Sequence, residues 1–180
     1  MKVSVIGSGY VGSVTAACFA EAGHEIICVD IDRKKTEQIN AGISPIYEEG
    51  LGELLQKYAG KKLIATTDYE FAVNETDISF ICVGTPSAEG GSIDLSIVRA
   101  AAASIGAALA KKEGYHVVVV KSTVVPETTE KFVLPVLEEA SGKTAGKDFG
   151  VAMNPEIRTS LDLHPSSLPL DSPSKARFVI

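Results

Sequence analysis

The sequence lacks tryptophan and any cluster of basic residues, and its net charge is −6. A nucleic-acid surface concentrates Lys and Arg, so we expect no nucleic-acid partner and a small ligand instead. An anionic ligand would have to be attracted by local backbone geometry, because the overall charge repels it. The first apolar run, residues 3–6, is broken at Gly7. It is too short for a secretory or membrane-spanning segment, and no membrane role is expected.

Cysteine is scarce, and its spacing favours no metal site. Cys18, Cys28 and Cys82 each lie within an apolar run and form no Cys-x-x-Cys pair. We therefore expect buried packing thiols. An odd number of scattered cysteines without a signal peptide predicts a cytoplasmic location.

Short apolar runs alternate with amphipathic stretches along the 180 residues, which suffice for one globular domain. This alternation predicts βαβ units and a parallel sheet buried on both faces. The expected fold class is α/β, a Rossmann-type doubly wound parallel sheet of about six strands in the order 3-2-1-4-5-6. The runs expected to form the strands are Val3–Ile6, Ile26–Asp30, Leu63–Thr66, Ile78–Val83, His116–Lys121 and Phe149–Met153.

Between these runs the apolar residues change to helical spacing. Two stripes stand out, ending at Gly23 and Gly114: Val11, Val14, Cys18 and Ala22 in the first, and Ile93, Ile97, Ala101, Ile105 and Leu109 in the second. A short helix is expected near Leu51–Tyr58 and a longer one from Pro126 to Ala140. In that longer helix Pro135 predicts a kink or a late start.

The most informative motif is the glycine loop Gly7–Gly12, which follows the first expected strand and opens the first expected helix. In such a loop Gly7 permits a tight turn, Gly9 lets a pyrophosphate approach the backbone, and Gly12 allows close helix–strand packing. The amides at the helix N-terminus, where Tyr10 and Val11 lie, then face the anion. The motif in this context predicts a dinucleotide site.

An acidic residue completes the fingerprint. Asp30 ends the second expected strand, 18 residues beyond Gly12, where a carboxylate can accept hydrogen bonds from the adenosine ribose and repel a 2′-phosphate. Asp30 therefore favours NAD over NADP, although it could instead be a helix N-cap. The basic residues Arg33, Lys34 and Lys35 leave NADP as an alternative, unless they are simply solvated.

Three polar segments follow the fourth, fifth and sixth expected strands, at the edge where ligands of a doubly wound sheet bind. They are Val83-Gly84-Thr85-Pro86, Lys121-Ser122-Thr123-Val124 and Asn154-Pro155-Glu156. Taken singly, Thr85 and Ser122 could be turn formers or helix caps. Lys121 could be a charge extending from a strand end, and Glu156 a surface charge. Their common position beside the glycine loop favours a functional site.

Several segments together resemble one family, the UDP-glucose/GDP-mannose dehydrogenases. They are GSGYVG at 7–12, VDID at 29–32, NAGISPIYEEGLGELL at 40–55, DISFICVGTPS at 77–87, GSIDLS at 91–96, KSTVVPETT at 121–129 and MNPE at 153–156. The resemblance implies an intact protein that oxidises the C6 alcohol of a nucleotide sugar to a carboxylate. That reaction uses two NAD in succession and a cysteine thiohemiacetal.

The resemblance also assigns site residues. Thr123 and Glu156 would lie near the reacting carbon, with Glu156 as acid/base or water-positioning group. The NAD site would contain Gly7, Gly9, Gly12, Asp30, Lys35, Thr85 and Thr123, with Tyr10, Val11, Val83, Gly84, Pro86 and Ser122 as neighbours. The implied partner is a nucleotide sugar. Homo-oligomerisation stays open, since family members dimerise largely through a middle domain.

The resemblance ends at Glu156. Before it, Glu49 and Glu127 replace a proline and a glycine that are usual in the family. After it, the usual Phe-Leu pair and second glutamate give way to Ile157–Leu161. We expect these 180 residues to contain neither the middle domain with the catalytic cysteine nor the C-terminal domain of the family, and none of the three cysteines matches the nucleophile.

We therefore expect 1–156 to be the NAD-binding Rossmann domain and 157–180 to be an irregular tail. The tail holds three of the eight prolines and no glycine. Our hypothesis is that it comes from a shifted reading frame or a cloning artefact, and that the chain is inactive alone. The alternatives are a non-catalytic NAD-binding module and a Rossmann hydroxyacid dehydrogenase fragment.

Overall fold

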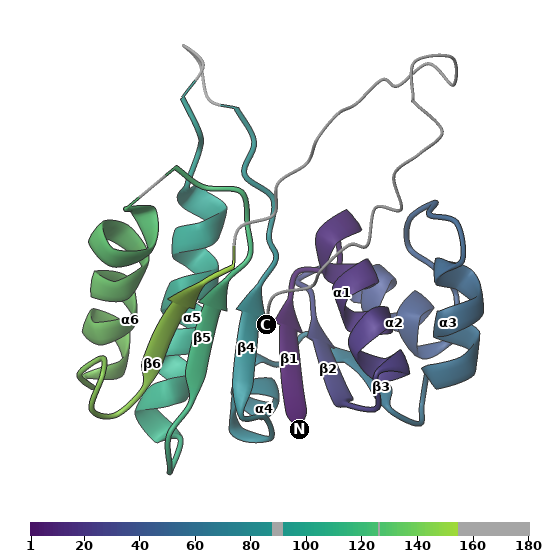
Figure 1. Ribbon diagram of the computed structural model, residues 1–180, viewed down its shortest axis with the longest axis horizontal. Coiled ribbons are helices and arrows are strands. Elements are labelled where there is room, and N and C mark those ends of the chain that lie inside the picture. Colours follow the sequence, from purple (N-terminus) through teal and green to yellow (C-terminus); the bar gives the residue numbers. More distant parts are fainter. Residues whose placement is uncertain (88–91, 126, 155–180) are drawn as a thin grey trace, which may run out of the picture.

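Six parallel strands form a single sheet, and the computed structural model describes residues 1–87, 92–125 and 127–154 (Figure 1). The strands are β1 Lys2–Ile6, β2 Glu25–Val29, β3 Leu63–Thr66, β4 Ile78–Ile81, β5 Val117–Val120 and β6 Gly150–Met153. They lie in the order β3-β2-β1-β4-β5-β6. The predicted fold class and strand order are confirmed, and each predicted strand end is within two residues of the observed one.

Helices cover the two faces of this sheet in two groups (Figure 1). One face carries α1 Tyr10–Glu21, α2 Arg33–Asn40 and α3 Leu51–Tyr58, and the other carries α4 Tyr69–Asn74, α5 Ser96–Lys111 and α6 Leu134–Ser141. None of the helices in the described ranges is long and apolar enough to cross a bilayer.

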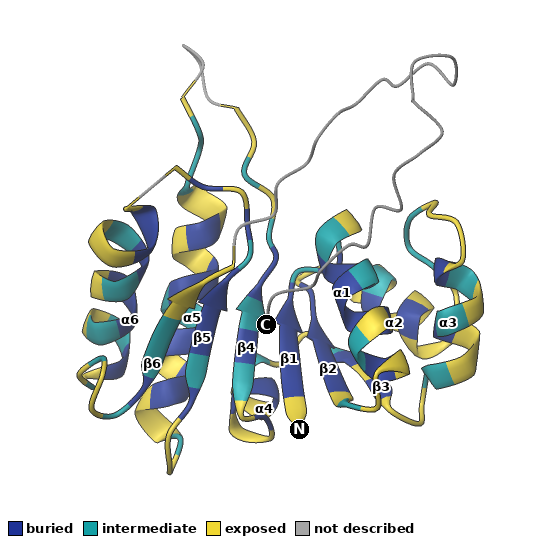
Figure 2. Cartoon of the chain, in the orientation of Figure 1, coloured by how far each residue is buried: buried dark blue, intermediate teal, exposed yellow. Residues whose placement is uncertain are grey.

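Alternate residues of the central strands pack into two separate hydrophobic cores. In β2, Ile26 and Cys28 pack into the core under α1–α3, whereas Ile27 and Val29 pack into the core under α4–α6. Figure 2 shows β1 and β2 as almost entirely buried. This two-sided burial explains why the strands have continuous apolar runs rather than an alternating pattern.

The most buried residues of α1 are not those of the apolar stripe seen in the sequence. The residues that α1 buries are the small ones, namely Gly12, Ser13, Thr15, Ala16, Ala17 and Ala20, because they let the helix lie close to the sheet. Val11 and Val14 are only partly buried, and Cys18 is exposed. The expectation of three buried thiols therefore holds for Cys28 and Cys82 but fails for Cys18.

The proline in the last predicted helix delays its α-helical part. A π-helical turn, Thr129–Val133, comes first, and α6 then begins at Leu134 with Pro135 in its first turn, where no amide donor is required. The late start is confirmed. The short helix Leu51–Tyr58 is also confirmed, whereas the six-residue helix α4 was not predicted.

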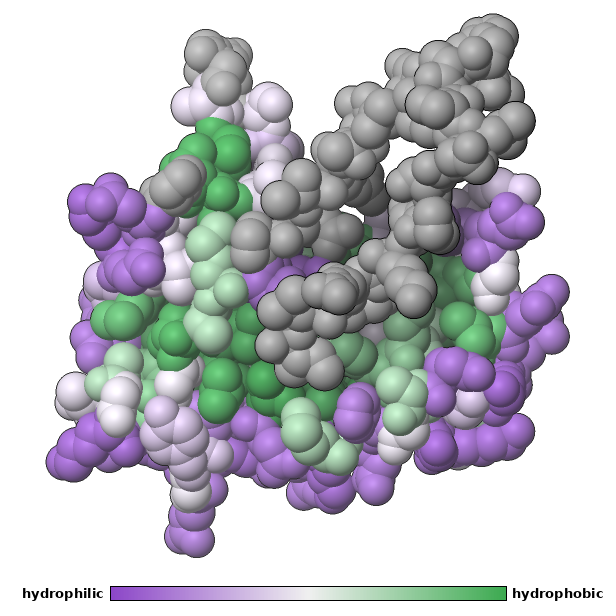
Figure 3. All heavy atoms as spheres, in the orientation of Figure 1, coloured by the Kyte–Doolittle hydropathy of each residue, from purple (hydrophilic) through white to green (hydrophobic). Residues whose placement is uncertain are grey.

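The sheet is covered unevenly. On the side of α1–α3, no helix in the described part of the chain lies over β5 and β6, where Figure 3 shows a mainly hydrophobic surface. Val117 is half-buried on this part of the sheet, and Ala152 is exposed. The chain thus leaves an apolar area over β5 and β6 on this side of the sheet.

Candidate cofactor site

The glycine loop lies at the carboxyl end of β1 and turns directly into α1 (Figure 1). Gly7 has a φ of +101°, and a Cβ on Gly12 would lie 1.8 Å from the Gly7 carbonyl oxygen. Both positions therefore require glycine for the fold itself. The tight turn and the close helix–strand approach predicted for these two residues are present.

Gly9 differs from Gly7 and Gly12 in that it has free space around it. It is the N-cap of α1, with φ −73° and ψ −164°, and no side chain caps the first-turn amides. A Cβ on Gly9 would meet no protein atom within 4 Å. The fold thus does not require glycine here. The open space above the helix N-terminus could receive an anionic group.

Asp30 lies beside this loop, buried at 9% exposure just after β2. Its Oδ2 accepts hydrogen bonds from the Ser8 amide, at 2.8 Å, and from the Ser8 hydroxyl. Its Oδ1 accepts one from the Asp32 amide at 2.9 Å. Burial alone would raise the pKa of Asp30, but the hydrogen bonds from Ser8 and Asp32, together with Lys35, hold that pKa below its ordinary value.

The residues around Asp30 resolve the alternative that it is a helix cap, and they show where its basic neighbours lie. The N-cap of α2 is Asp32, whose side chain accepts from the Lys34 amide, so Asp30 is not a cap. Lys35 places its ammonium 4.0 Å from Oδ2 of Asp30. Arg33 pairs with Glu37 on its own helix at 3.1 Å.

The loops after β4 and β5 brace each other through their hydroxyl groups. Thr85 donates to the Thr123 carbonyl at 3.0 Å, and Ser122 donates to the Val83 carbonyl at 2.7 Å. Neither hydroxyl caps a helix. The β4 loop also contacts the glycine loop, because a Cβ on Gly7 would lie 3.0 Å from the Cys82 carbonyl oxygen.

The structure therefore brings the predicted loops together at one edge of the sheet. Gly84, Pro86 and Thr123 are exposed on this rim, and Val83 and Thr85 are half-buried. Glu156 lies outside the described residues, so its proposed role remains a prediction. Asn154, two positions earlier, donates to the Val120 carbonyl at 3.0 Å and extends the ladder beyond β6.

Sequence reasoning missed Ser8, which it treated as an unspecified position between two glycines. Ser8 is fully buried, and its carbonyl accepts a hydrogen bond from the Ser13 hydroxyl at 2.9 Å. The sequence offered only one hint of this role, namely that Ser8 is the one residue of the Gly7–Gly12 loop with a small hydroxyl side chain.

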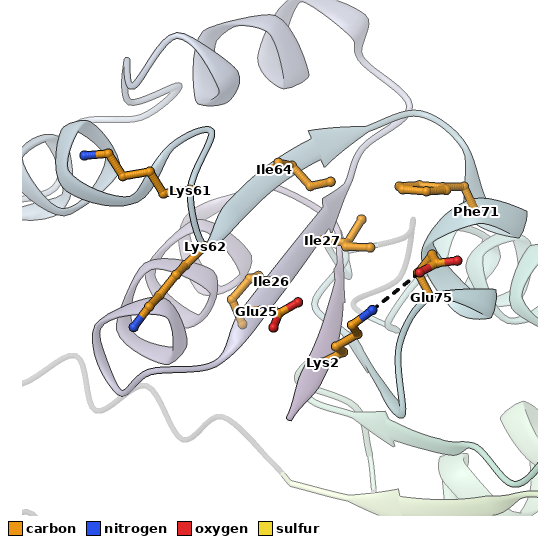
Figure 4. Close-up of a pocket in the computed structure, with 9 residues that line it drawn as sticks. All are labelled: Lys2, Glu25, Ile26, Ile27, Lys61, Lys62, Ile64, Phe71 and Glu75. Carbon is orange, nitrogen blue, oxygen red and sulfur yellow. Dashed lines mark ion pairs between the residues drawn. The ribbon is translucent and has the colours of Figure 1, made fainter.

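A surface cavity of about 180 Å³ lies at the opposite edge, among the amino ends of β1–β3 (Figure 4). Its walls combine apolar side chains, among them Ile64 and Phe71, with the Lys2–Glu75 ion pair at 3.5 Å. It is remote from the glycine loop and is not part of the candidate site. No cluster of His, Cys, Asp and Glu that could hold a metal occurs among the described residues.

Comparison with known proteins supports these features. Residues 1–166 match the model of the UDP-glucose/GDP-mannose dehydrogenase family, NAD binding domain. The chain is 52% identical over 157 residues to UDP-glucose 6-dehydrogenase AglM of Haloferax volcanii, covering 87% of the chain and 36% of that protein. It is 49% identical over 159 residues to GDP-mannose 6-dehydrogenase of Pseudomonas aeruginosa, with the same two coverages.

A solved structure extends this similarity to the backbone. The GDP-mannose dehydrogenase of Pseudomonas aeruginosa, solved as a ternary complex, aligns with a TM-score of 0.84 and 48% identity over 87% of the chain and 36% of that structure. The chain thus spans little more than a third of the length of these relatives.

Proposed function

Because the chain belongs to the UDP-glucose/GDP-mannose dehydrogenase family and corresponds to its NAD-binding domain, we propose that it forms the cofactor half of a nucleotide-sugar 6-dehydrogenase. The proposed reaction oxidises the C6 alcohol of a UDP- or GDP-sugar to a carboxylate. NAD held at the glycine loop would supply the hydride acceptor for each of the two oxidations, and one water would supply the second carboxylate oxygen. The chain would supply cofactor binding, and the rest of such an enzyme would supply the nucleophile.

The observation that carries this proposal is the open backbone at Gly9. A residue that the fold does not require to be glycine stands where the pyrophosphate of NAD would approach the amides of α1. On this proposal Gly7 and Gly12 shape the loop, and Tyr10 and Val11 lie in the first turn beside the phosphates. The residues present therefore fit the cofactor.

The other predicted residues would contact the remaining parts of the dinucleotide. Asp30 would accept from the adenosine ribose, with Lys35 beside it. The braced loops that contain Val83, Gly84, Thr85, Pro86, Ser122 and Thr123 would border the nicotinamide half. Thr123 would lie near the reacting carbon. Glu156 would hold or move a proton there, or orient the attacking water.

The three cysteines support the proposal that the catalytic nucleophile lies outside this chain. Burial raises the pKa of the Cys28 thiol far above its ordinary value, and Cys82 is also buried. A thiol that is buried and protonated is a poor nucleophile. Cys18 is exposed, but it lies near the far end of α1 from the glycine loop. We therefore expect no complete turnover by the chain alone.

A reconstitution experiment tests the proposal. The chain is mixed with the separately expressed remainder of a relative, and the absorbance of NADH is followed with UDP-glucose or GDP-mannose as substrate. We expect two NADH per sugar in the mixture and none from the chain alone. NADH formation by the chain alone would contradict the division of labour. A folded complex that binds NAD but yields no NADH would favour a non-catalytic module.

A further inference from the structure

Ser8 is the most heavily engaged residue of the glycine loop. It has no exposed surface. Its amide and its hydroxyl both donate to Oδ2 of Asp30, and its carbonyl accepts from the Ser13 hydroxyl. Ser8 therefore joins three parts of the fold, namely the loop, the end of β2 and the first turn of α1.

These bonds consume most of the hydrogen-bonding capacity of Asp30. An ionised carboxylate offers about four acceptor positions, two on each oxygen. Ser8 fills both positions on Oδ2, and the Asp32 amide fills one on Oδ1. The ammonium of Lys35 also approaches Oδ2, at 4.0 Å. One acceptor position, on Oδ1, is left for a ligand.

We propose that Ser8 is a positioning residue that fixes the Asp30 carboxylate, so that Oδ2 fastens the glycine loop and Oδ1 receives one hydroxyl of the adenosine ribose. This inference rests on the proposed NAD-binding function and assigns a role to a position that the glycine fingerprint leaves unspecified. The terminal torsion of an aspartate is otherwise broad and roughly two-fold. Without the Ser8 hydroxyl, the Ser8 and Asp32 amides still hold the carboxylate. It then has more rotational freedom, and its alignment with the ribose is weakened.

The positioning role differs from a purely structural one in how it affects ribose recognition. Loss of loop stability weakens the binding of every dinucleotide by the same factor. Loss of carboxylate alignment weakens only the contribution of the ribose hydroxyl. The ratio between the dissociation constants of a deoxy analogue and of NAD therefore separates the two roles.

The experiment titrates NAD, and NAD lacking the 2′- or the 3′-hydroxyl of its adenosine ribose, into the chain by calorimetry. Wild type, Ser8→Ala and Ser13→Ala are compared, since Ser13→Ala removes a buried hydroxyl from the same junction without touching Asp30. For wild type and Ser13→Ala we expect one analogue to bind about tenfold more weakly than NAD, which is typical of a lost hydrogen bond to a charged group. For Ser8→Ala the same ratio should fall to about threefold or less.

The outcomes separate this inference from the function on which it rests. A ratio in Ser8→Ala equal to that of wild type overturns the positioning role and leaves NAD binding intact. Failure of the wild-type chain to bind NAD overturns both. If Ser8→Ala does not fold, Ser8→Gly removes the same hydroxyl, and Ser8→Thr, which keeps it, should retain the wild-type ratio.

Discussion

At the scale of single residues, Glu127 is the clearest departure from ordinary backbone geometry. It has a φ of +70°, and no other non-glycine residue in the described ranges has a positive φ. It lies in the segment between Thr123 and the π-helical turn. Its carboxylate pairs with Lys131 at 2.8 Å, but both side chains are largely exposed, so the pair contributes little.

Replacing Glu127 by glycine should stabilise the chain. Left-handed backbone costs about 1–2 kcal/mol for a residue with a Cβ, and the greater freedom of glycine in the unfolded chain offsets part of the gain. We expect the free energy of unfolding of Glu127→Gly to exceed that of Glu127→Ala by about 1 kcal/mol. Chemical denaturation measures both variants, and equal stabilities would show that the backbone here is not strained.

At the scale of elements, α5 and α6 pack closely through Gly106. A Cβ on Gly106 would lie 2.6 Å from the Ala140 Cβ and 3.1 Å from the Leu137 carbonyl oxygen. The contact belongs to the core under α4–α6, which also holds Ile105 and Leu137. Glycine, normally unfavourable within a helix, is here required by the neighbouring helix.

Gly106→Ala should therefore destabilise the chain despite the better helix propensity of alanine. Overpacking of this kind costs about 1–3 kcal/mol. The matched control is Gly52→Ala in α3, where a Cβ meets nothing within 4 Å. That control should raise stability by about 0.5 kcal/mol. Thermal unfolding compares the two variants, and shifts of the same sign would contradict the packing account.

The elements also show what the sequence could predict and what it could not. The strands were predicted because burial on both faces leaves continuous apolar runs, as in β2. The apolar stripe of α1 did not identify its most buried residues, because close packing selected alanine, serine and glycine, which a search for large apolar residues passes over. Helix α4 has only six residues, too few to show a helical period.

The candidate site also has features that the sequence predicted and features that it did not. The glycine loop and Asp30 were predicted from spacing, since the backbone geometry at Gly7 and Gly12 allows no other residue. The bonds between Ser8 and Asp30 were not predicted, because they depend on how the loop folds onto the end of β2. Roles for Thr123 and Glu156 rest on the family resemblance and stay predictions.

At the scale of the whole molecule, a buried polar network spans the central strands and makes stability depend on pH. His116, 1% exposed just before β5, shares hydrogen bonds with the Thr76 carbonyl at Nδ1 and the Ser79 hydroxyl at Nε2. Ser79 in turn bonds Ser4 on β1 at 2.6 Å. Because a carbonyl only accepts, Nδ1 carries the proton of a neutral imidazole.

Burial, helped by the nearby Lys112 ammonium, lowers the pKa of His116 from 6.5 to about 4. Between these values the unfolded chain binds a proton that the folded chain does not, so stability falls as pH decreases. From pH 6.5 to 5 we expect a loss of about 1.5 kcal/mol in the free energy of unfolding, measured by urea denaturation. His116→Gln should be less stable at pH 7 and nearly insensitive to pH in this range. A wild-type curve as flat as that of the variant would contradict the account.

At the same scale, the candidate cofactor site lies beside an unevenly covered sheet. The glycine loop, Asp30 and the two braced loops meet at the carboxyl ends of the strands, while β5 and β6 expose apolar surface on the side of α1–α3 (Figure 3). The chain matches little more than a third of the length of its relatives. Cofactor binding is therefore the activity that the chain itself should display.

Calorimetric titration of the chain with NAD and NADP, repeated on Gly9→Ala, tests this account most directly. The added methyl group would meet no protein atom within 4 Å, and the backbone at Gly9 is allowed for alanine. The stability of the variant should therefore change by less than about 1 kcal/mol. We expect wild type to bind NAD and to prefer it over NADP, and Gly9→Ala to bind NAD at least about tenfold more weakly. A wild-type preference for NADP, or unchanged NAD affinity in folded Gly9→Ala, would contradict the assignment of the site.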